Sequence, residues 1–236
     1  MAGVLPRLAK IKGRALGLFF PQWCIGCGRE GEFLCVACYR SLSRILPPLC
    51  PRCGKPQPSG ILCSGCVGWQ AEIDGIRAPF QFNGVMREAI HQLKYQNLRA
   101  LALPFAQLLS DYLGANPLPG EVLVPVPLHQ KRLRERGYNQ SYLLARELGK
   151  LVNLPVVDDC LVRQRHTPPQ ARTPTVEERR RNVHGAFACR NRNLSDKQVL
   201  LIDDVSTSGA TVDACAAALK AAGATSVWGL VLAREI

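Results

Sequence analysis

One stretch near the end of the chain, Val199–Val212, strongly limits the folds that this sequence can adopt. It opens with four apolar residues in a row, Val199 to Ile202, which is typical of a strand buried on both faces of a parallel α/β sheet. Two adjacent carboxylates, Asp203 and Asp204, come where that strand would emerge from the sheet. A loop of small residues follows, and an apolar stripe then predicts a helix that ends at Gly223. The stretch therefore predicts a strand, a loop and a helix in an α/β fold.

The loop in this stretch has the chemistry of an anion site. Its small residues let backbone N–H groups turn inward around a phosphate, and the helix dipole adds roughly 0.3–1 kcal/mol per charge. The acidic pair could hold two sugar hydroxyls or a hydrated Mg²⁺ ion. The alternative is an ordinary strand–loop–helix connection with solvated carboxylates.

The whole pattern resembles the PRPP-binding motif of type I phosphoribosyltransferases. The resemblance implies that Asp203 and Asp204, the candidate catalytic residues, hold the ribose hydroxyls. It also implies that the loop holds the 5′-phosphate. The predicted PRPP-binding residues are Val205, Ser206, Thr207, Ser208, Gly209, Ala210 and Thr211.

Four CxxC pairs mark the first third of the chain. Because no secretory signal is recognisable, we expect a reducing, cytoplasmic compartment, in which structural disulfides are rare. Paired CxxC motifs then predict two structural Cys₄ zinc sites, since four thiolates leave no open coordination position. The spacing leaves open whether neighbouring pairs share a zinc or the ligation is crossed. The predicted ligands are Cys24, Cys27, Cys35, Cys38, Cys50, Cys53, Cys63 and Cys66.

The net charge of the chain limits its partners. The formal charge is +12 when all thiols are counted as neutral. Each Zn(Cys⁻)₄ centre carries two net negative charges, so two centres lower the total to about +8. The protein stays basic, which suits a polyphosphate ligand or nucleic acid. No apolar run approaches ~18 residues, so we expect no transmembrane helix.

Composition divides the chain into three parts. Residues 1–22 are predicted to form an amphipathic helix, residues 23–70 a double zinc ribbon, and residues 71–236 the main domain. Within the main domain, a helix is predicted over Met86–Tyr95. His91 and Lys94 share one face of it. They could reach a phosphate, but a solvated helix face is the expected role.

Two basic segments follow in the main domain. The first comes after an apolar strand, Val122–Leu128, and is predicted to be a loop that clamps pyrophosphate, because guanidinium groups bind phosphate oxygens bidentately. The alternative is a solvated surface loop. Its cations are Lys131, Arg132, Arg134 and Arg136.

The second basic segment, Arg163–Arg181, is predicted to be an exposed loop before a charged turn at Val176–Asn182. It is a possible lid over the site, and disorder without function is the alternative. The candidate lid residues are Arg163, Thr167, Gln170 and Arg172.

The order of motifs along the chain is specific. The CxxC pairs are followed by Ile90-His-Gln-Leu-Lys-Tyr95, Val124-Pro-Val-Pro127, Arg136-Gly-Tyr-Asn-Gln140, Thr167-Pro-Pro-Gln170, Arg181-Asn182 and Leu201–Thr211. From Cys24 onward the chain resembles the ComF family of phosphoribosyltransferase-like proteins. The resemblance implies a type I phosphoribosyltransferase fold, with a parallel sheet flanked by helices and a hood, plus an N-terminal double zinc ribbon. It also implies a role in natural competence, the uptake of single-stranded DNA, alongside a helicase-like partner.

Two classes of function remain open from the sequence. In the first, the protein is a phosphoribosyltransferase that uses PRPP and Mg²⁺ and displaces pyrophosphate onto an unidentified acceptor. In the second, it is a non-catalytic protein that binds single-stranded DNA or a protein partner, with the fold as a scaffold or PRPP as a signal. A helicase-like competence protein could dock on the zinc module in either case.

Overall fold

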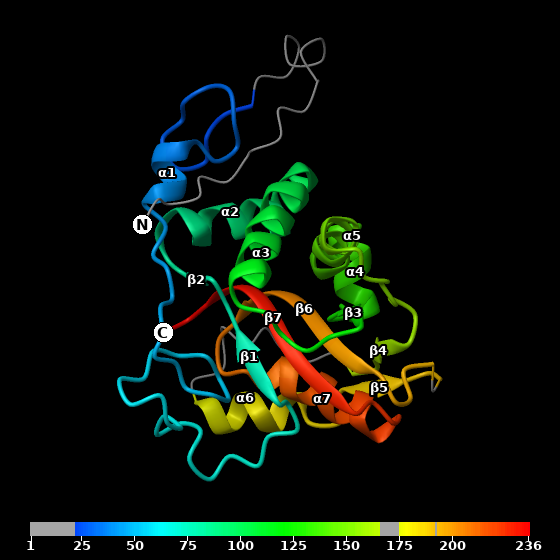
Figure 1. Cartoon of the computed structure of the whole chain (residues 1–236). Helices are drawn as coiled ribbons and strands as arrows, with labels where there is room; N and C mark the ends of the chain where they lie inside the picture. Colours follow the sequence, from blue (N-terminus) through cyan, green and yellow to red (C-terminus); the bar gives the residue numbers. More distant parts are fainter. Residues whose placement is uncertain (1–21, 166–174, 192) are drawn as a thin grey trace.

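The computed structural model describes residues 22–165, 175–191 and 193–236 (Figure 1). The amphipathic helix predicted for residues 1–22 falls almost wholly outside these ranges. Three of the candidate lid residues, Thr167, Gln170 and Arg172, also lie outside them.

A parallel sheet of five strands forms the centre of the main domain. Its strands are β1 (Gly75–Arg77), β2 (Phe80–Gln81), β3 (Val122–Pro125), β6 (Gln198–Ser206) and β7 (Ser226–Arg234). The order is β1-β7-β6-β3, and β2 pairs with the carboxyl end of β7. The predicted apolar run lies in β6, between β3 and β7, and is buried on both faces. This confirms the expected parallel α/β arrangement.

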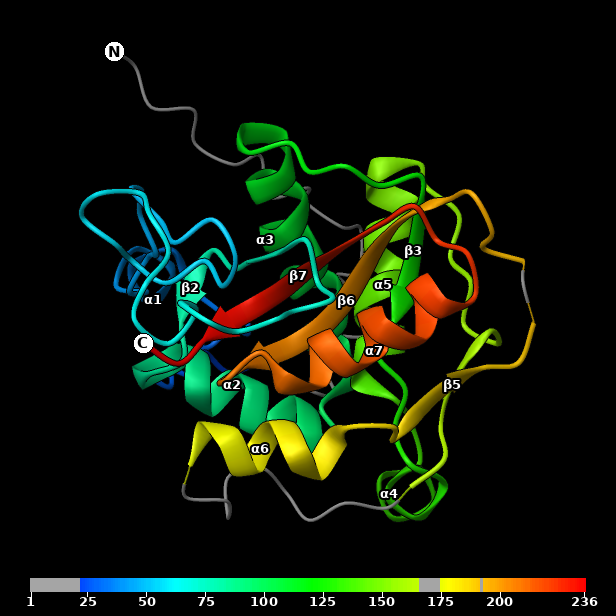
Figure 2. The same cartoon turned by 90° about the horizontal axis from the view of Figure 1, so that it is seen from below.

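Helices cover both faces of the sheet (Figures 1 and 2). One face carries α2 (Gly84–Tyr95), α3 (Ala102–Ala115) and α5 (Gln140–Val152), and a 3₁₀ turn (Arg99–Leu101) precedes α3. The other face carries α7 (Ala210–Ala221), beside which lies α6 (Val176–Val183). Alternate residues of β6 explain the two layers: Leu200 and Ile202 join the core of the α2 side, and Leu201 joins that of the α7 side.

The basic segment predicted as a loop after β3 is instead a short helix, α4 (Gln130–Arg136). The ring of His129 accepts a hydrogen bond from Lys131 N at its start, at 3.2 Å. Gly137 ends the helix in the left-handed conformation, with φ of 79°. These two caps are local, and the helix has no buried face, so the apolar pattern gave no sign of it.

The second basic segment is also more ordered than expected over the residues described. Arg163 lies in β4 (Leu161–Arg163), which pairs antiparallel with β5 (Phe187–Cys189), and not in an exposed loop. The predicted charged turn forms α6, which opens with a capping box between Thr175 and Glu178.

The two halves of the cysteine-rich region contact different parts of the main domain (Figure 1). The first half, which holds α1 (Val36–Arg40), lies beside α2, where Gly26 is in close contact with Val85. The second half lies along β1 and α6: Ile76 N donates to Arg52 O at 2.7 Å, and Arg180 donates to Gly65 O at 3.1 Å. A segment between them runs beside β2, where Gln81 N donates to Ser43 O at 2.8 Å.

Within the described ranges, no helix has both the length and the apolar character needed to cross a membrane.

Candidate functional site

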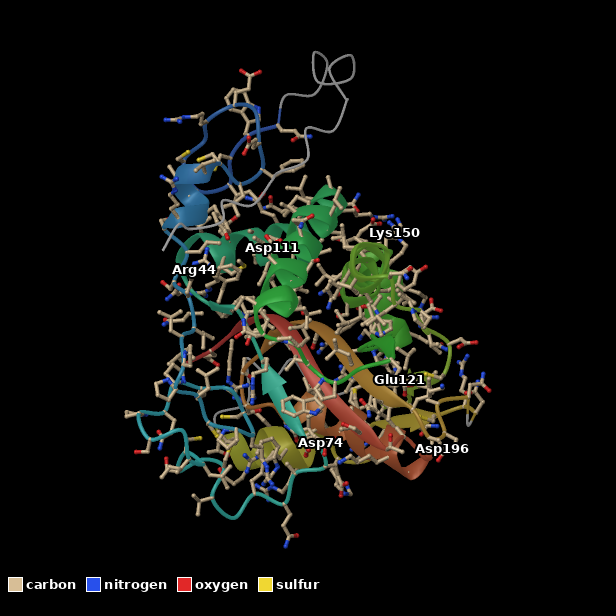
Figure 3. The ribbon with its side chains drawn as sticks, viewed as in Figure 1. Arg44, Asp74, Asp111, Glu121, Lys150 and Asp196 are labelled. Atoms are coloured by element: carbon tan, nitrogen blue, oxygen red, sulfur yellow. The ribbon has the colours of Figure 1, made fainter. Side chains whose placement is uncertain are left out.

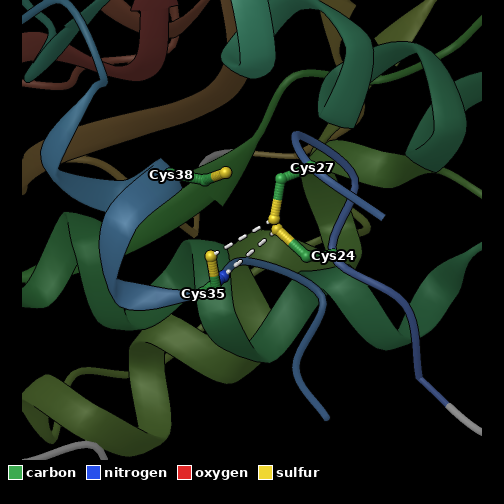
Figure 4. Close-up of side chains that lie close together, drawn as sticks. All are labelled: Cys24, Cys27, Cys35 and Cys38. Atoms are coloured by element: carbon green, nitrogen blue, oxygen red, sulfur yellow. Dashed lines mark hydrogen bonds between the residues drawn. The ribbon is translucent and has the colours of Figure 1, made fainter. Parts of the chain in front are cut away.

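The eight paired cysteines form two separate clusters. Cys24, Cys27, Cys35 and Cys38 make the first, and Cys50, Cys53, Cys63 and Cys66 the second; within each, all sulfurs lie within 4.8 Å of one another. Figure 4 shows the first cluster gathered around one point. Neighbouring CxxC pairs therefore share a centre, which settles the question that the spacing left open.

The sulfur spacing fits zinc. Four thiolates at 2.3 Å from a tetrahedral Zn²⁺ lie ~3.8 Å from one another. The Sγ–Sγ distance is 3.7 Å between Cys27 and Cys35 and 3.6 Å between Cys53 and Cys63.

The two centres share a local design. Gly28 and Gly54 each follow a CxxC pair with φ near 71–72°, which turns the backbone around the metal position. Cys35 N donates to Cys24 Sγ, and Cys63 N donates to Cys50 Sγ, each at 3.4 Å.

The ionisation of the thiols also points to a cation. Burial opposes ionisation of Cys24 and Cys50, but these and other backbone hydrogen bonds lower the pKa of each to about 6. Burial and the neighbouring sulfurs raise the pKa of Cys38 to about 12. Four thiolates can therefore share each cluster only around a positive ion, which Zn²⁺ supplies.

The acidic pair lies buried at the carboxyl end of β6. Asp203 Oδ1 accepts two hydrogen bonds, from Ser141 Oγ at 2.7 Å and from Asp204 N at 2.9 Å. Asp204 Oδ2 forms an ion pair with Lys94 Nζ at 2.5 Å, and its Oδ1 accepts from Gln140 at 3.4 Å. Residues from α2, α5 and β6 thus meet at one end of the sheet.

The pKa values of the two carboxyl groups are shifted in opposite directions. Burial and the neighbouring charge of Asp204 raise the pKa of Asp203 to about 8. Burial also opposes ionisation of Asp204, but Lys94 outweighs it and holds the pKa of Asp204 below its usual range. One negative charge, on Asp204, is therefore favoured at neutral pH.

The predicted phosphate loop connects β6 to α7. Gly209 is the N-cap of α7 with φ of 82°, a conformation that favours glycine. The ring of Trp69 and the side chain of Ile76 pack against it. At the other end of the loop, Arg234 Nη1 donates to Ser206 Oγ at 3.1 Å. The N-terminus of α7 and the acidic pair lie at opposite ends of the same short segment.

Only some of the predicted clamp residues face this region. Arg132 and Arg136, one helical turn apart on α4, line a cavity of about 550 Å³ together with Lys94 and Arg99. Arg136 also donates to Gln140 and lies over the ring of Tyr95.

The other two clamp candidates, Lys131 and Arg134, are exposed and do not line that cavity. Arg163, predicted as a lid residue, is close enough to Asp203 and Arg132 for its charge to interact with both. It lines a second cavity, of about 910 Å³, between α4, α5 and β4.

Sequence reasoning missed four residues at this site: Lys94, Gln140, Ser141 and Arg234. Lys94 was expected on a solvated face. Gln140 ends the Arg136–Gln140 motif and Ser141 follows it, so the motif was the one available signal for both. The contact between Arg234 and Ser206 depends on the pairing of β6 and β7, which no local pattern states.

Comparison with known proteins gives the same two parts. The family described as "Double zinc ribbon domain" matches residues 15–67, and the "Phosphoribosyl transferase domain" matches residues 134–235. "Competence protein F" of Haemophilus influenzae is 30% identical over 91% of this chain and 99% of its own length. The chain belongs to the ComF family. "Competence protein ComFC" of Bacillus subtilis is 29% identical over 88% of this chain and 86% of its own length. "DNA utilization protein YhgH" of Escherichia coli K12 is 29% identical over 86% of this chain and 91% of its own length.

This ComF-family protein therefore has a phosphoribosyltransferase fold with an N-terminal double zinc ribbon, as predicted. The phosphoribosyltransferase match begins within α4, so Lys94 and Arg132 lie before it. Both nevertheless reach the site that the matched part contains.

Proposed function

We propose that this ComF-family protein binds PRPP at the carboxyl end of its parallel sheet and transfers the phosphoribosyl group to an unidentified acceptor. The observation that carries the proposal is the buried pair Asp203 and Asp204, held between Ser141 and Lys94 and followed by the small-residue loop. Carboxylate oxygens at this position can accept hydrogen bonds from ribose hydroxyls. The loop and the start of α7 offer backbone N–H groups to the 5′-phosphate.

The basic cavity beside Asp204 suits the leaving group. Lys94, Arg132 and Arg136 line it, and arginine binds phosphate oxygens bidentately. In the reaction, the C1–O bond to pyrophosphate breaks and the electron pair leaves with pyrophosphate. A lone pair of the acceptor forms the new bond to C1, and the acceptor then loses a proton. The cations would stabilise the leaving group, and the acidic pair would hold the ribose in line.

Magnesium fits this arrangement as part of the ligand. Mg²⁺ in such sites is held mostly by substrate phosphates and water, with one or two carboxylates. Glu135 lines the cavity that Lys94 lines, and Asp204, next to Asp203, forms an ion pair with Lys94, so carboxylates for the ion are at hand. When bound, the ion would neutralise charge that develops on pyrophosphate.

The biological role follows from the relatives, two of which are named as competence proteins and one as a DNA utilization protein. We place this protein in the same kind of process, so that DNA or a nucleotide derived from it is an acceptor to test.

A non-catalytic role is the second candidate. The ring of Tyr95 is 67% exposed beside the basic cavity, and Trp23 is 55% exposed on the first ribbon, an arrangement that could stack bases of single-stranded DNA. DNA binding through six phosphates would weaken by about 10³-fold or more between ~50 and ~200 mM salt. PRPP binding in a Mg²⁺-dependent cavity would change less.

Calorimetric titration of the zinc-loaded protein with PRPP, with and without Mg²⁺, tests the proposal. We expect Mg²⁺-dependent binding that weakens at least about tenfold, or ~1.4 kcal/mol, in a D203N/D204N double variant. Asp196→Asn is the matched control, since Asp196 is exposed and distant from the site (Figure 3). Wild-type protein that does not bind PRPP, or a double variant that binds as well as wild type, would overturn the proposal.

A further inference from the structure

Arg234, the last residue of β7, is a buried cation without a carboxylate partner among the described residues. Its side chain is 2% exposed, and it lies opposite Ser206 in the pairing of β6 and β7. Nη1 donates to Ser206 Oγ, while Nε has no hydrogen-bond partner in the described part of the chain. No acidic side chain within those ranges forms an ion pair with it. A buried guanidinium in this state is costly unless another negative charge compensates it.

The second cysteine cluster can supply that charge. Burial lowers the pKa of Arg234, and the charges of the second centre's thiolates, Cys53, Cys66, Cys63 and Cys50, oppose that shift. Four thiolates on one Zn²⁺ carry two net negative charges. A zinc-loaded second centre therefore compensates Arg234, and Arg234 in turn favours the loaded centre.

Trp69 makes a second connection between this centre and the loop. It follows Cys66 by three residues and is buried in the same core. A Cβ atom on Gly209 would lie only 3.2 Å from its ring. Arg52, within the second centre, donates to the Trp69 carbonyl oxygen, and Arg180 lies over the ring at 4.1 Å. Arg234 therefore contacts the loop at one end, and Trp69, which the second centre positions, contacts it at the other.

The first centre differs, although its local design is the same. Its close contact is with Val85 of α2, through Gly26. Among the described residues, the buried core that contains Trp69, Ala210 and three cysteines of the second centre includes no cysteine of the first centre. The two centres therefore provide a matched comparison within one chain.

We propose that the second cysteine centre positions the phosphate loop through Arg234 and Trp69, so that metal occupancy at this centre sets how tightly the loop binds a phosphate group. Arg234 acts as a positioning residue: by donating to Ser206 Oγ, it leaves the hydroxyl proton of Ser206 to donate elsewhere. The ligand rests on the function proposed above, but the order of the loop does not.

The test compares Cys35→Ser with Cys63→Ser. These cysteines hold equivalent positions in the two centres, and both are half-buried. We expect each variant to lose metal from one of two centres, as measured by zinc analysis. Hydrogen–deuterium exchange of residues 206–211 should accelerate at least about tenfold in Cys63→Ser and stay within about twofold of wild type in Cys35→Ser.

The same pair of variants is then titrated with PRPP. Affinity should fall about tenfold or more only in Cys63→Ser. Equal loosening of the loop in both variants, or in neither, would overturn the positioning role. If exchange of residues 206–211 accelerated only in Cys63→Ser, but neither wild type nor the variants bound PRPP, the positioning role would be supported and the proposed function would be wrong.

A second set of variants removes the connection while keeping the ligands. Arg234→Met keeps the length of the side chain but not its charge, and should accelerate both exchange of residues 206–211 and zinc release to a chelator from the second centre. Arg234→Lys restores the charge and should recover the slow zinc release. If Arg234→Met left exchange and zinc release unchanged in folded protein, the centre would not act through Arg234.

Discussion

Asp203 and Asp204 are neighbours in sequence, yet their contacts differ. Lys94 forms an ion pair with Asp204, whereas Ser141 Oγ and the Asp204 N–H donate hydrogen bonds to Asp203. At neutral pH the buried pair therefore carries one proton, on Asp203, and one negative charge, on Asp204. A ligand that replaces Lys94 or adds a metal ion would change which of the two groups is ionised.

Asp203→Asn is expected to stabilise the folded protein. The same oxygen, Oδ1, accepts both hydrogen bonds of Asp203, so an amide oxygen can replace it, and the repulsion from Asp204 disappears. Because the folded pKa of about 8 lies above the unfolded value of ~3.9, the wild-type protein loses stability as pH rises between these values. Thermal unfolding should show a Tm advantage for Asp203→Asn of a few °C that widens from pH 4 to pH 8. A constant difference, or a lower Tm throughout, would contradict the assignment.

Lys94→Met should have the opposite effect. It leaves the buried charge of Asp204 without its ion pair, and the expected loss of stability is about 1–3 kcal/mol. The value is below that of a fully buried pair because the Lys94 side chain is 21% exposed. Urea unfolding at pH 7 measures it, with Lys150→Met on the exposed side of α5 as control. Equal midpoints for the two variants would show that the ion pair contributes nothing measurable.

For individual residues, the sequence predicted which ones belong to the site better than it predicted their side-chain contacts. Asp203 and Asp204 were found because a buried strand ended at two carboxylates. Lys94 was not, because the apolar stripe of α2 fixes which residues are buried but not what the rim of that stripe meets. Leu93 is fully buried, and Lys94 follows it at the edge of the buried face, beside the end of β6.

Among the elements, the turn between β6 and α7 is tightly constrained. Gly209 has φ of 82°, and a Cβ atom there would lie 3.0 Å from Ile76 and 3.2 Å from Trp69. Gly209→Ala combines an unfavourable backbone conformation with crowding, and we expect it to cost about 1–3 kcal/mol. Urea unfolding measures the loss. Gly114→Ala on α3, which has open space around it, is the control and should be neutral or slightly stabilising.

Whether an element could be predicted depended on how much of it is buried. The strands β3 and β6 and the helices α2 and α7 carry apolar patterns that their packing requires, and they were expected. The short helices α4 and α6 have one buried residue or none. They are held by caps and charge, so reading for apolar periodicity predicted a loop for α4 and a charged turn for α6.

Across the whole molecule, the linker between the second zinc centre and β1 is fastened by two carboxylates. Asp213 of α7 accepts from Glu72 N and Ile73 N at 2.8 and 3.0 Å. Asp74 accepts from Val227 N at 2.6 Å and pairs with Lys220 at 2.7 Å; Figure 3 labels it beside α7. These contacts join the metal-binding region to the sheet.

Asp74→Asn is expected to loosen that connection. Burial opposes ionisation of Asp74, but Lys220 and the Val227 N–H outweigh it and keep its pKa below the usual range. Its contribution is therefore present above the unfolded pKa of ~3.9 and is lost as pH falls through the folded value. Asp74→Asn should cost about 1 kcal/mol at pH 7. The difference in Tm should shrink below about pH 4, and exposed Asp111→Asn should show no such pattern. If the Tm difference between wild type and Asp74→Asn stayed the same in acid, the contribution of Asp74 would not depend on its charge.

The second zinc ribbon also covers one edge of the sheet. β1 is a terminal strand in the order β1-β7-β6-β3, and backbone groups of the second ribbon and of the segment 43–45 bond to β1 and β2. A bare strand of this kind is a template for pairing with another chain. Zinc here does more than hold a small module together, because it keeps that template covered. A chain that has lost its metal would expose an unpaired strand edge. Its first visible defect in a concentrated solution would then be self-association.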